Sequence, residues 1–301
     1  MTPDRSARAL AWAEAGLACL ALALVGLVAA DGRGGLVGAA IGAALGLAWV
    51  RRRGAREARR RQAITAPFPV RWRSILAHRY DHYSRLPEVP RRAFEQRVQA
   101  FLAEKRITGV GAVVTEELRV LVAASAATLS LAWNAYPWDQ LAEVLLYARD
   151  FDRDYSFEGR ELAGQAHPWG TIIISVPTLH QSFDDPDDGY HVGLHEFAHL
   201  MDKVGTHFDG ILPGLDEPRS KAWVALAATE MERMRRGQSV IDPYGSESPV
   251  EFLAVAVEAF FERPLALRRD HREVYGMLRD YFGQDPAAWD EARGVVAFPP
   301  A

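Results

Sequence analysis

The chain has 301 residues, enough for one sizeable domain with an extension or for two small domains. Its net charge of −4 is unevenly divided: residues 1–62 carry +6, because ten Arg stand against four acidic residues, and the remainder carries −10. An acidic body lacks the clustered Lys and Arg that neutralise phosphates, which argues against nucleic acid as its partner. The only cysteine is Cys19, so no intramolecular disulfide can form and the fold does not depend on an oxidising compartment.

Residues 1–62 predict a transmembrane helical hairpin followed by an Arg-rich juxtamembrane segment. Residues 9–30 are apolar apart from Glu14 and are long enough to cross a hydrocarbon core of about 30 Å. A second, shorter apolar run covers residues 34–50, and the sequence DGRGG at residues 31–35 predicts a tight turn between the two runs. Glycines recur every four residues in the second run, which favours close helix packing in lipid.

The arginines predict the orientation of this hairpin. Arg5 and Arg8 precede the first run, and seven Arg follow the second run between residues 51 and 61. Positive charge favours the cytoplasmic side, so we expect an inner (cytoplasmic) membrane protein whose body lies in the cytoplasm. The alternative is a secretory signal peptide cleaved near Ala30, which leaves the second run and its arginines unexplained.

Residues 63–301 predict a single α+β domain that is mainly helical with a small sheet. Apolar residues recur at helical spacing in several segments, and Thr115 is a typical N-cap. Two segments rich in branched and aromatic residues, bounded by Gly, Pro and Asp, predict strands at 141–151 and 171–176. The expected helices cover residues 91–106, 115–132, 192–203, 219–236, 249–262 and 266–282.

The sequence HEFAH at residues 195–199 matches the HExxH motif of metallopeptidases. Residues four apart on a helix differ by only about 40° around its axis, so His195 and His199 can reach one ion. Imidazole suits zinc, and a catalytic zinc keeps three protein ligands and an open position for water. Glu196 is then placed to accept a proton from that water as the general base. The alternative is a solvated helix face, but the surrounding sequence GLHEFAHLMD is apolar, and burying these polar groups without a ligand is costly.

The third ligand must be sought among several residues. His191 lies on the same helix face, but eight helical residues separate it from His199 by about 12 Å along the axis, so we expect it at the start of the helix instead. Glu251, Glu258 and Glu262 share roughly one face of the helix expected at 249–262, and their chemistry alone does not choose among them. The sequence SPVE, which ends at Glu251, is also a capping box.

From about residue 78 to residue 286 the sequence resembles the Mlc titration factor A family of zinc-dependent peptidases. The resemblance is carried, in order, by FLAEKRITGVGAVVTEELRVLVAASA, TIIISVP, HEFAHLMD, DPYGSESPVEFLAVAVEAFFERP and YFGQDP. It implies a zincin-like domain that binds Zn²⁺ through His195, His199 and Glu251, with Glu196 as the catalytic glutamate. It also implies that Tyr244 donates a hydrogen bond to the oxyanion; the alternative is a turn residue of DPYG.

Two further features carry alternatives. Asp202, three residues after His199, is a candidate to orient a metal ligand, or else a solvated residue at the helix end. The strand at 171–176 is either an edge strand that pairs with extended substrate or a purely structural strand.

Together these features predict a membrane-tethered zinc-dependent metallopeptidase that faces the cytoplasm and cleaves a peptide or protein substrate. The alternative function is a regulatory binding protein that sequesters a transcriptional repressor or a membrane partner, with zinc mainly structural. Replacing Glu196 by Gln separates them, because the first function requires a general base and the second does not.

Overall fold

The computed structural model describes residues 32–133, 137–150, 164–167, 170–204 and 207–294. The chain divides into two compact units, Met1–Ala63 and Ile64–Ala301. In the first unit, helix α2 (Gly32–Thr65) is continuous through the Arg-rich segment. The predicted turn at residues 31–35 is therefore wrong from Gly32 onward, since glycine adopts helical angles at only a modest entropic cost.

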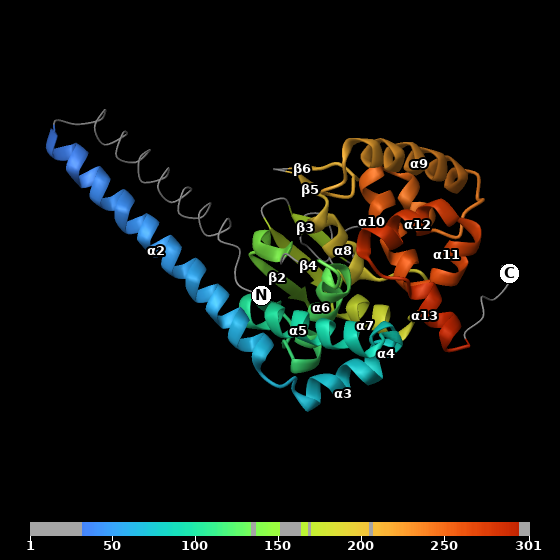
Figure 1. Ribbon diagram of the computed structural model, residues 1–301, viewed down its shortest axis with the longest axis horizontal. Coiled ribbons are helices and arrows are strands. Elements are labelled where there is room, and N and C mark those ends of the chain that lie inside the picture. The colour runs from blue at the N-terminus through green and yellow to red at the C-terminus, as the bar shows by residue number, and fades with distance from the viewer. Residues whose placement is uncertain (1–31, 134–136, 151–163, 168–169, 205–206, 295–301) are drawn as a thin grey trace. The chain divides into compact units, whose positions relative to one another are not determined.

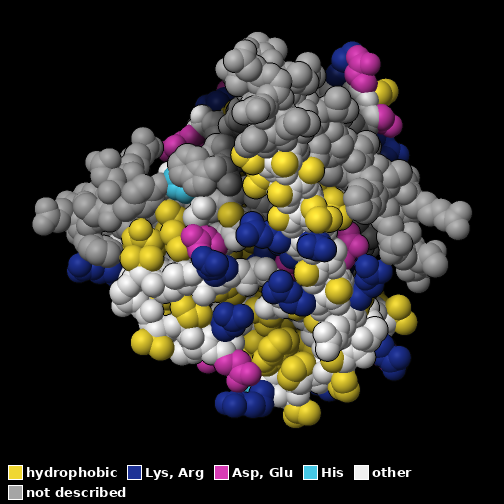
Figure 2. Space-filling view, turned by 90° about the vertical axis from the view of Figure 1, so that its left-hand side faces the viewer, with side chains coloured by type: hydrophobic (Ala, Val, Ile, Leu, Met, Phe, Trp, Pro, Cys, Tyr) yellow, Lys and Arg dark blue, Asp and Glu magenta, His cyan; other side chains and the backbone are white. Residues whose placement is uncertain are grey.

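The exposed side chains of α2 combine apolar and basic residues. Ile41, Leu45, Leu47 and Trp49 are exposed, and the guanidinium of Arg53 lies 5.3 Å from the ring centre of Trp49. Figure 2 shows a face on which Lys and Arg side chains lie among hydrophobic ones. The first predicted span, residues 9–30, lies outside the described residues, and in the part that is described no helix has both the length and the apolar character to cross a membrane. Membrane attachment stays a prediction.

The second unit contains a four-stranded mixed sheet with the order β1-β2-β4-β3. Strands β1 (Arg106–Val110), β2 (Glu143–Tyr147) and β4 (Thr171–Ser175) are parallel, and β3 (Gly164–His167) runs antiparallel to β4. The register aligns Ile107, Val144 and Ile172 in one buried row across the sheet. These branched side chains anchor the sheet to the core.

The strand predicted at 171–176 is present as β4, but its assignment as a possible edge strand is wrong. β4 lies between β2 and β3, so the edge is formed by β3. The sequence GQAH of β3 contains no branched or aromatic strand former, which explains why the pattern did not predict it. Strand β1 was also missed, because the helical pattern was extended to Arg106; α5 (Glu88–Glu104) ends before it.

Helices pack beside this sheet and form a second helical group toward the C-terminus (Figure 1). Helix α8 (Val192–Met201) is central, because it contacts β3, β4, α6 (Glu116–Ser130) and α10 (Pro249–Glu262). The other helices and short elements of the described chain are α3 (Val70–Arg79), α4 (Asp81–Arg85), η1 (Pro137–Gln140), α7 (Val176–Asp184), β5 (Lys203–Val204), β6 (His207–Phe208), α9 (Glu217–Arg235), η2 (Pro243–Ser246), α11 (Pro264–Asp270), α12 (Arg272–Phe282) and α13 (Pro286–Ala292).

Helices α6 and α8 approach closely because small residues face each other. A Cβ added at Gly193 would lie 2.3 Å from Ser125 Oγ, so no larger residue fits there. Thr115 caps α6 as expected, accepting a hydrogen bond from the Leu118 amide at 3.2 Å. The helix expected at 266–282 is instead two helices, broken at His271, whose buried ring lies 2.7 Å from Glu230 Oε2.

Candidate metal centre

Helix α8 holds the two motif histidines side by side. His191 is its N-cap, and the ring Nδ1 accepts a hydrogen bond from the Leu194 amide at 3.2 Å, so the expectation of a helix-start residue is confirmed. One turn further on, His195 and His199 present their Nε2 atoms 3.0 Å apart. Both side chains are largely buried at this point of α8.

Helix α10 brings Glu251 to the same place. Ser248 is the N-cap, and its hydroxyl accepts from the Glu251 amide at 3.2 Å. The Glu251 carboxylate instead faces the histidines, with Oε2 at 3.2 Å from His195 Nε2 and 3.3 Å from His199 Nε2. The backbone of Glu251 therefore belongs to the cap while its side chain belongs to the cluster.

The three side chains converge as metal ligands do. Their ligand atoms all lie within 4.8 Å of one another. Three ligands about 2.0 Å from a tetrahedral ion are separated by about 3.3 Å, close to the separations in this cluster. Glu251 Oε2 makes no hydrogen bond of acceptable geometry despite its proximity to both rings. The donor set and its spacing therefore fit a divalent metal such as zinc.

Glu258 contacts His195 on the ring nitrogen that faces away from the cluster. It is 1% exposed, and its Oε1 lies 2.7 Å from His195 Nδ1, while its Oε2 accepts from the His191 amide. This contact holds a proton on Nδ1 and leaves Nε2 free to bind a metal. Burial disfavours the charged ring, but the carboxylates of Glu258 and Glu251 outweigh it and raise the pKa of His195 well above its usual value. Glu258 is thus an outer partner of the centre rather than a ligand.

Glu196 lies between the ligands in sequence and is only 3% exposed. Burial raises its pKa to about 8, and its Oε2 has no hydrogen-bond partner among the described residues. The edge strand β3 lies directly against it, because a Cβ added at Gly164 would be 2.4 Å from Glu196 Oε1. The glycine leaves room for a carboxyl group whose pKa suits proton transfer near neutral pH.

Tyr244 lies at the side of the cluster on η2. Its ring centre is 6.2 Å from that of His195, and the side chain is 42% exposed. Asp242 fixes the start of η2 by accepting from the Tyr244 amide at 2.8 Å. The phenol is therefore near the candidate ligands and accessible from solvent.

Two residues considered from the sequence have other positions. Glu262 lines a separate small cavity and does not join the cluster. Asp202 is fully buried, so it is not a solvated helix-end residue, and its carboxylate accepts hydrogen bonds from the amides of Gly210 and Ile211 and contacts no candidate ligand directly. The interpretation of Asp202 as a solvated residue is therefore wrong, whereas its role in orienting a metal ligand stays a prediction.

Comparison with known proteins agrees with this geometry. The model of the glucose-regulated metallo-peptidase M90 family matches residues 55–283. The chain belongs to this family. It is also 30% identical, over 245 residues, to an uncharacterized protein of Synechocystis, slr2042, covering 76% of this chain and 89% of that protein. The resemblance drawn from the sequence is confirmed, and the M90 member described here is a metallopeptidase with a candidate metal site of the zincin type.

Proposed function

We propose that this M90 metallopeptidase hydrolyses peptide bonds with a zinc ion held by His195, His199 and Glu251. The observation that carries the proposal is the convergence of two imidazole nitrogens and one carboxylate oxygen within 4.8 Å, beside a buried glutamate. A zinc ion held in this way polarises a carbonyl group and makes water a better nucleophile near neutral pH.

Glu196 is the general base in this proposal. Its buried carboxylate accepts the proton of the attacking water and then donates it to the leaving amine. Support comes from its unpartnered Oε2 and from burial, which raises its pKa to about 8. Tyr244 donates a hydrogen bond to the oxyanion that develops on the substrate carbonyl, a role supported by its ring lying 6.2 Å from that of His195.

Strand β3 is the element that would align the substrate. It is an edge strand of the sheet, and Gly164 brings its backbone against Glu196. An extended peptide that adds to a free strand edge gains main-chain hydrogen bonds without requiring particular side chains. Peptide and protein substrates fit this arrangement better than small molecules do.

The deciding experiment replaces Glu196 by Gln in the full chain. Glu196→Gln removes the base but none of the three ligands, so zinc content should stay stoichiometric while kcat for a peptide substrate falls by about 100- to 10,000-fold. His199→Ala is the control, since it should lose both metal and activity. Turnover within a few-fold of wild type in the Glu196→Gln protein would contradict the assignment.

A further inference from the structure

Asp202 connects the end of α8 to the backbone of Gly210 and Ile211. It caps the helix that carries His195 and His199, and it is completely buried. Its carboxylate accepts the Gly210 amide, at 3.0 Å to Oδ1 and 2.8 Å to Oδ2, and the Ile211 amide at 3.2 Å. A buried carboxylate with several amide donors is a rigid attachment, because losing it leaves those donors unpaired.

Gly210 in turn lies against the first residue of α10. Its φ is +76°, and a Cβ there would lie 2.4 Å from the carbonyl carbon and oxygen of Pro249. Trp223 holds the loop from the other side, donating from Nε1 to the Gly210 carbonyl at 2.7 Å. The Trp223 ring also packs on Phe252, which follows Glu251 in the chain, with ring centres 5.6 Å apart.

These contacts join the two helices that carry the ligands by a route separate from the cluster. The route runs from Asp202 at the end of α8, through the Gly210 backbone, to Pro249 at the start of α10. Pro249 is two residues before Glu251, and Asp202 is three residues after His199. The backbone at Gly210 therefore acts as a spacer between α8 and α10. Its size sets the distance between His199 and Glu251.

We propose that Asp202 and Gly210 are positioning residues of the metal centre, and that they fix the separation of His199 from Glu251 before any metal binds. The proposal rests on the ligand set given under Proposed function. Ligands carried by separate helices bind an ion tightly only when the surrounding structure holds them near the required geometry. Neither residue belongs to the proposed ligand set.

Gly210→Ala tests the spacer, and Gly214→Ala is its matched control. Both glycines have positive φ, +76° and +80°, so both substitutions strain the backbone similarly, but a Cβ at Gly214 meets nothing within 4 Å. In full-length protein, competition of zinc with a chelator should show affinity lowered by about 10- to 100-fold in Gly210→Ala. Gly214→Ala should stay within about 3-fold of wild type, as expected for a strained residue that touches no ligand element.

Two further measurements separate positioning from general destabilisation. In cobalt-loaded protein the visible absorption spectrum reports ligand geometry, and it should change in Gly210→Ala but not in Gly214→Ala. Asp202→Asn, which keeps one acceptor oxygen, should weaken zinc binding less than Asp202→Ala. Equal zinc affinity and equal spectra in both glycine variants would overturn the proposal. A wild-type chain without stoichiometric metal would instead overturn the ligand set itself, so the two failures are distinguishable.

Discussion

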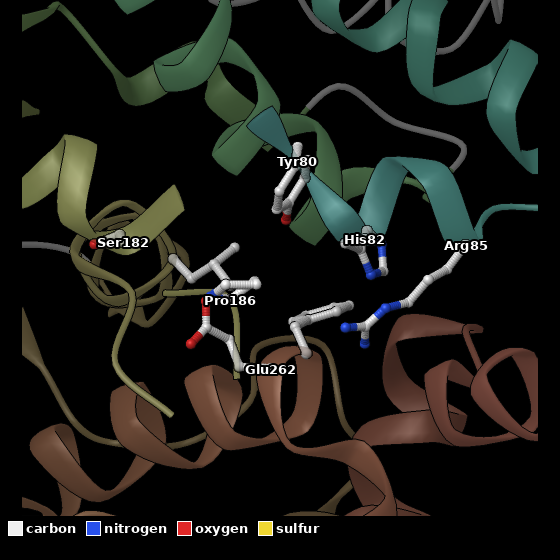
Figure 3. A pocket seen from close by; sticks show the side chains of 8 residues that line it. Tyr80, His82, Arg85, Ser182, Pro186 and Glu262 are labelled. Carbon is white, nitrogen blue, oxygen red and sulfur yellow. The ribbon is translucent and has the colours of Figure 1, made fainter. Parts of the chain in front are cut away.

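Helix α10 contributes glutamates to two different places, the candidate metal centre and a small cavity. Glu251 and Glu258 face the histidines of α8, whereas Glu262 lines a cavity of about 10 Å³, which is about the room that one water needs. The cavity is bordered by Tyr80, His82, Arg85, Ser182, Pro186 and Glu262, among others (Figure 3). Both places therefore combine buried carboxyl and imidazole groups.

The two places differ in how these groups face one another. In the cavity, the Glu262 carboxyl group points toward Pro186 and Ser182, away from His82 (Figure 3). Burial, with the nearby Asp188, raises the pKa of Glu262 to about 10, and burial, with Arg85, lowers the pKa of His82 to about 3. Both groups are thus neutral at pH 7.

At the candidate metal centre the outcome is different, and Glu251 is only partly buried there. Burial also disfavours the charge of Glu251, but the imidazoles of His195 and His199 outweigh it and hold its pKa well below the usual range. Burial alone favours the neutral form of a carboxyl group, as at Glu262. Contact with two imidazoles favours the charged form, as at Glu251, and a metal requires a charged carboxylate. Convergence, rather than burial or residue type, therefore distinguishes a candidate metal site.

Zinc affinity should respond to a substitution at the candidate metal centre but not to the same substitution at the cavity, and this is the largest expected difference. Glu258→Gln removes the negative charge behind His195, which lowers the basicity of that ligand, so zinc affinity should fall by about 10- to 100-fold. Glu262→Gln makes the same chemical change one turn further along α10 and should leave zinc affinity unchanged. Chelator competition on both proteins measures the difference. Equal affinity in the two variants would show that His195 does not need its carboxylate partner.

The pH dependence of stability should identify Glu262 as a neutral acid. In the unfolded chain its carboxyl ionises near pH 4.5, but in the folded protein only near pH 10. The folded state therefore binds this proton more tightly, and its contribution to stability is lost as pH rises from about 4.5 toward 10. Glu262→Gln removes this loss, so between pH 5 and pH 8 it should gain at least about 1.4 kcal/mol relative to wild type. Urea unfolding of the metal-free proteins at several pH values measures the gain.

The exposed Glu247 supplies the control for this measurement. Glu247→Gln should leave the pH profile of unfolding parallel to that of wild type. A Glu262→Gln profile that is also parallel to wild type would show that the Glu262 carboxyl is ionised in the folded protein.

Local sequence signals were enough for those parts of the fold and site that local interactions determine. The capping residues Thr115 and Ser248 mark helix starts, and HEFAH places two imidazoles on one face whatever the rest of the chain does. Helix spacing also placed Glu251 and Glu258 on one face. It could not show that Glu251 contacts both histidines or that Glu258 contacts His195, because these contacts depend on how α10 packs on α8.

The missed features all depend on tertiary contacts that no local sequence pattern reveals. Strand β3 has no strand-forming residues of its own and exists because β4 supplies its hydrogen bonds. Gly164 gives no sign in the sequence that it lies against Glu196, more than thirty residues later. Asp202 was expected near the helix end, but no local pattern predicts that its carboxylate binds the amides of Gly210 and Ile211. In each case the tertiary contact, rather than the propensity, decides the role.

The smallest expected effect compares two N-caps whose hydrogen bonds have the same length. Ser248 caps α10 and Thr115 caps α6, each accepting one backbone amide at 3.2 Å. Ser248→Ala and Thr115→Ala should each lower the free energy of unfolding by about 1 kcal/mol, because one buried or half-buried amide loses its partner. The amide bound by Ser248 belongs to a proposed ligand, Glu251, and the amide bound by Thr115 does not. Only Ser248→Ala should therefore also weaken zinc binding, by roughly 2- to 5-fold, consistent with a loss of less than about 1 kcal/mol.

If both cap variants bind zinc equally well, the first turn of α10 is held in place without its cap. The contact of Pro249 with Gly210 is then sufficient to position Glu251, and the cap contributes to folding alone. If Ser248→Ala weakens binding, and the double variant with Gly210→Ala is weakened by the product of the two separate factors, the cap and the spacer act independently on Glu251. A smaller combined effect means that both act through the same displacement of the α10 terminus.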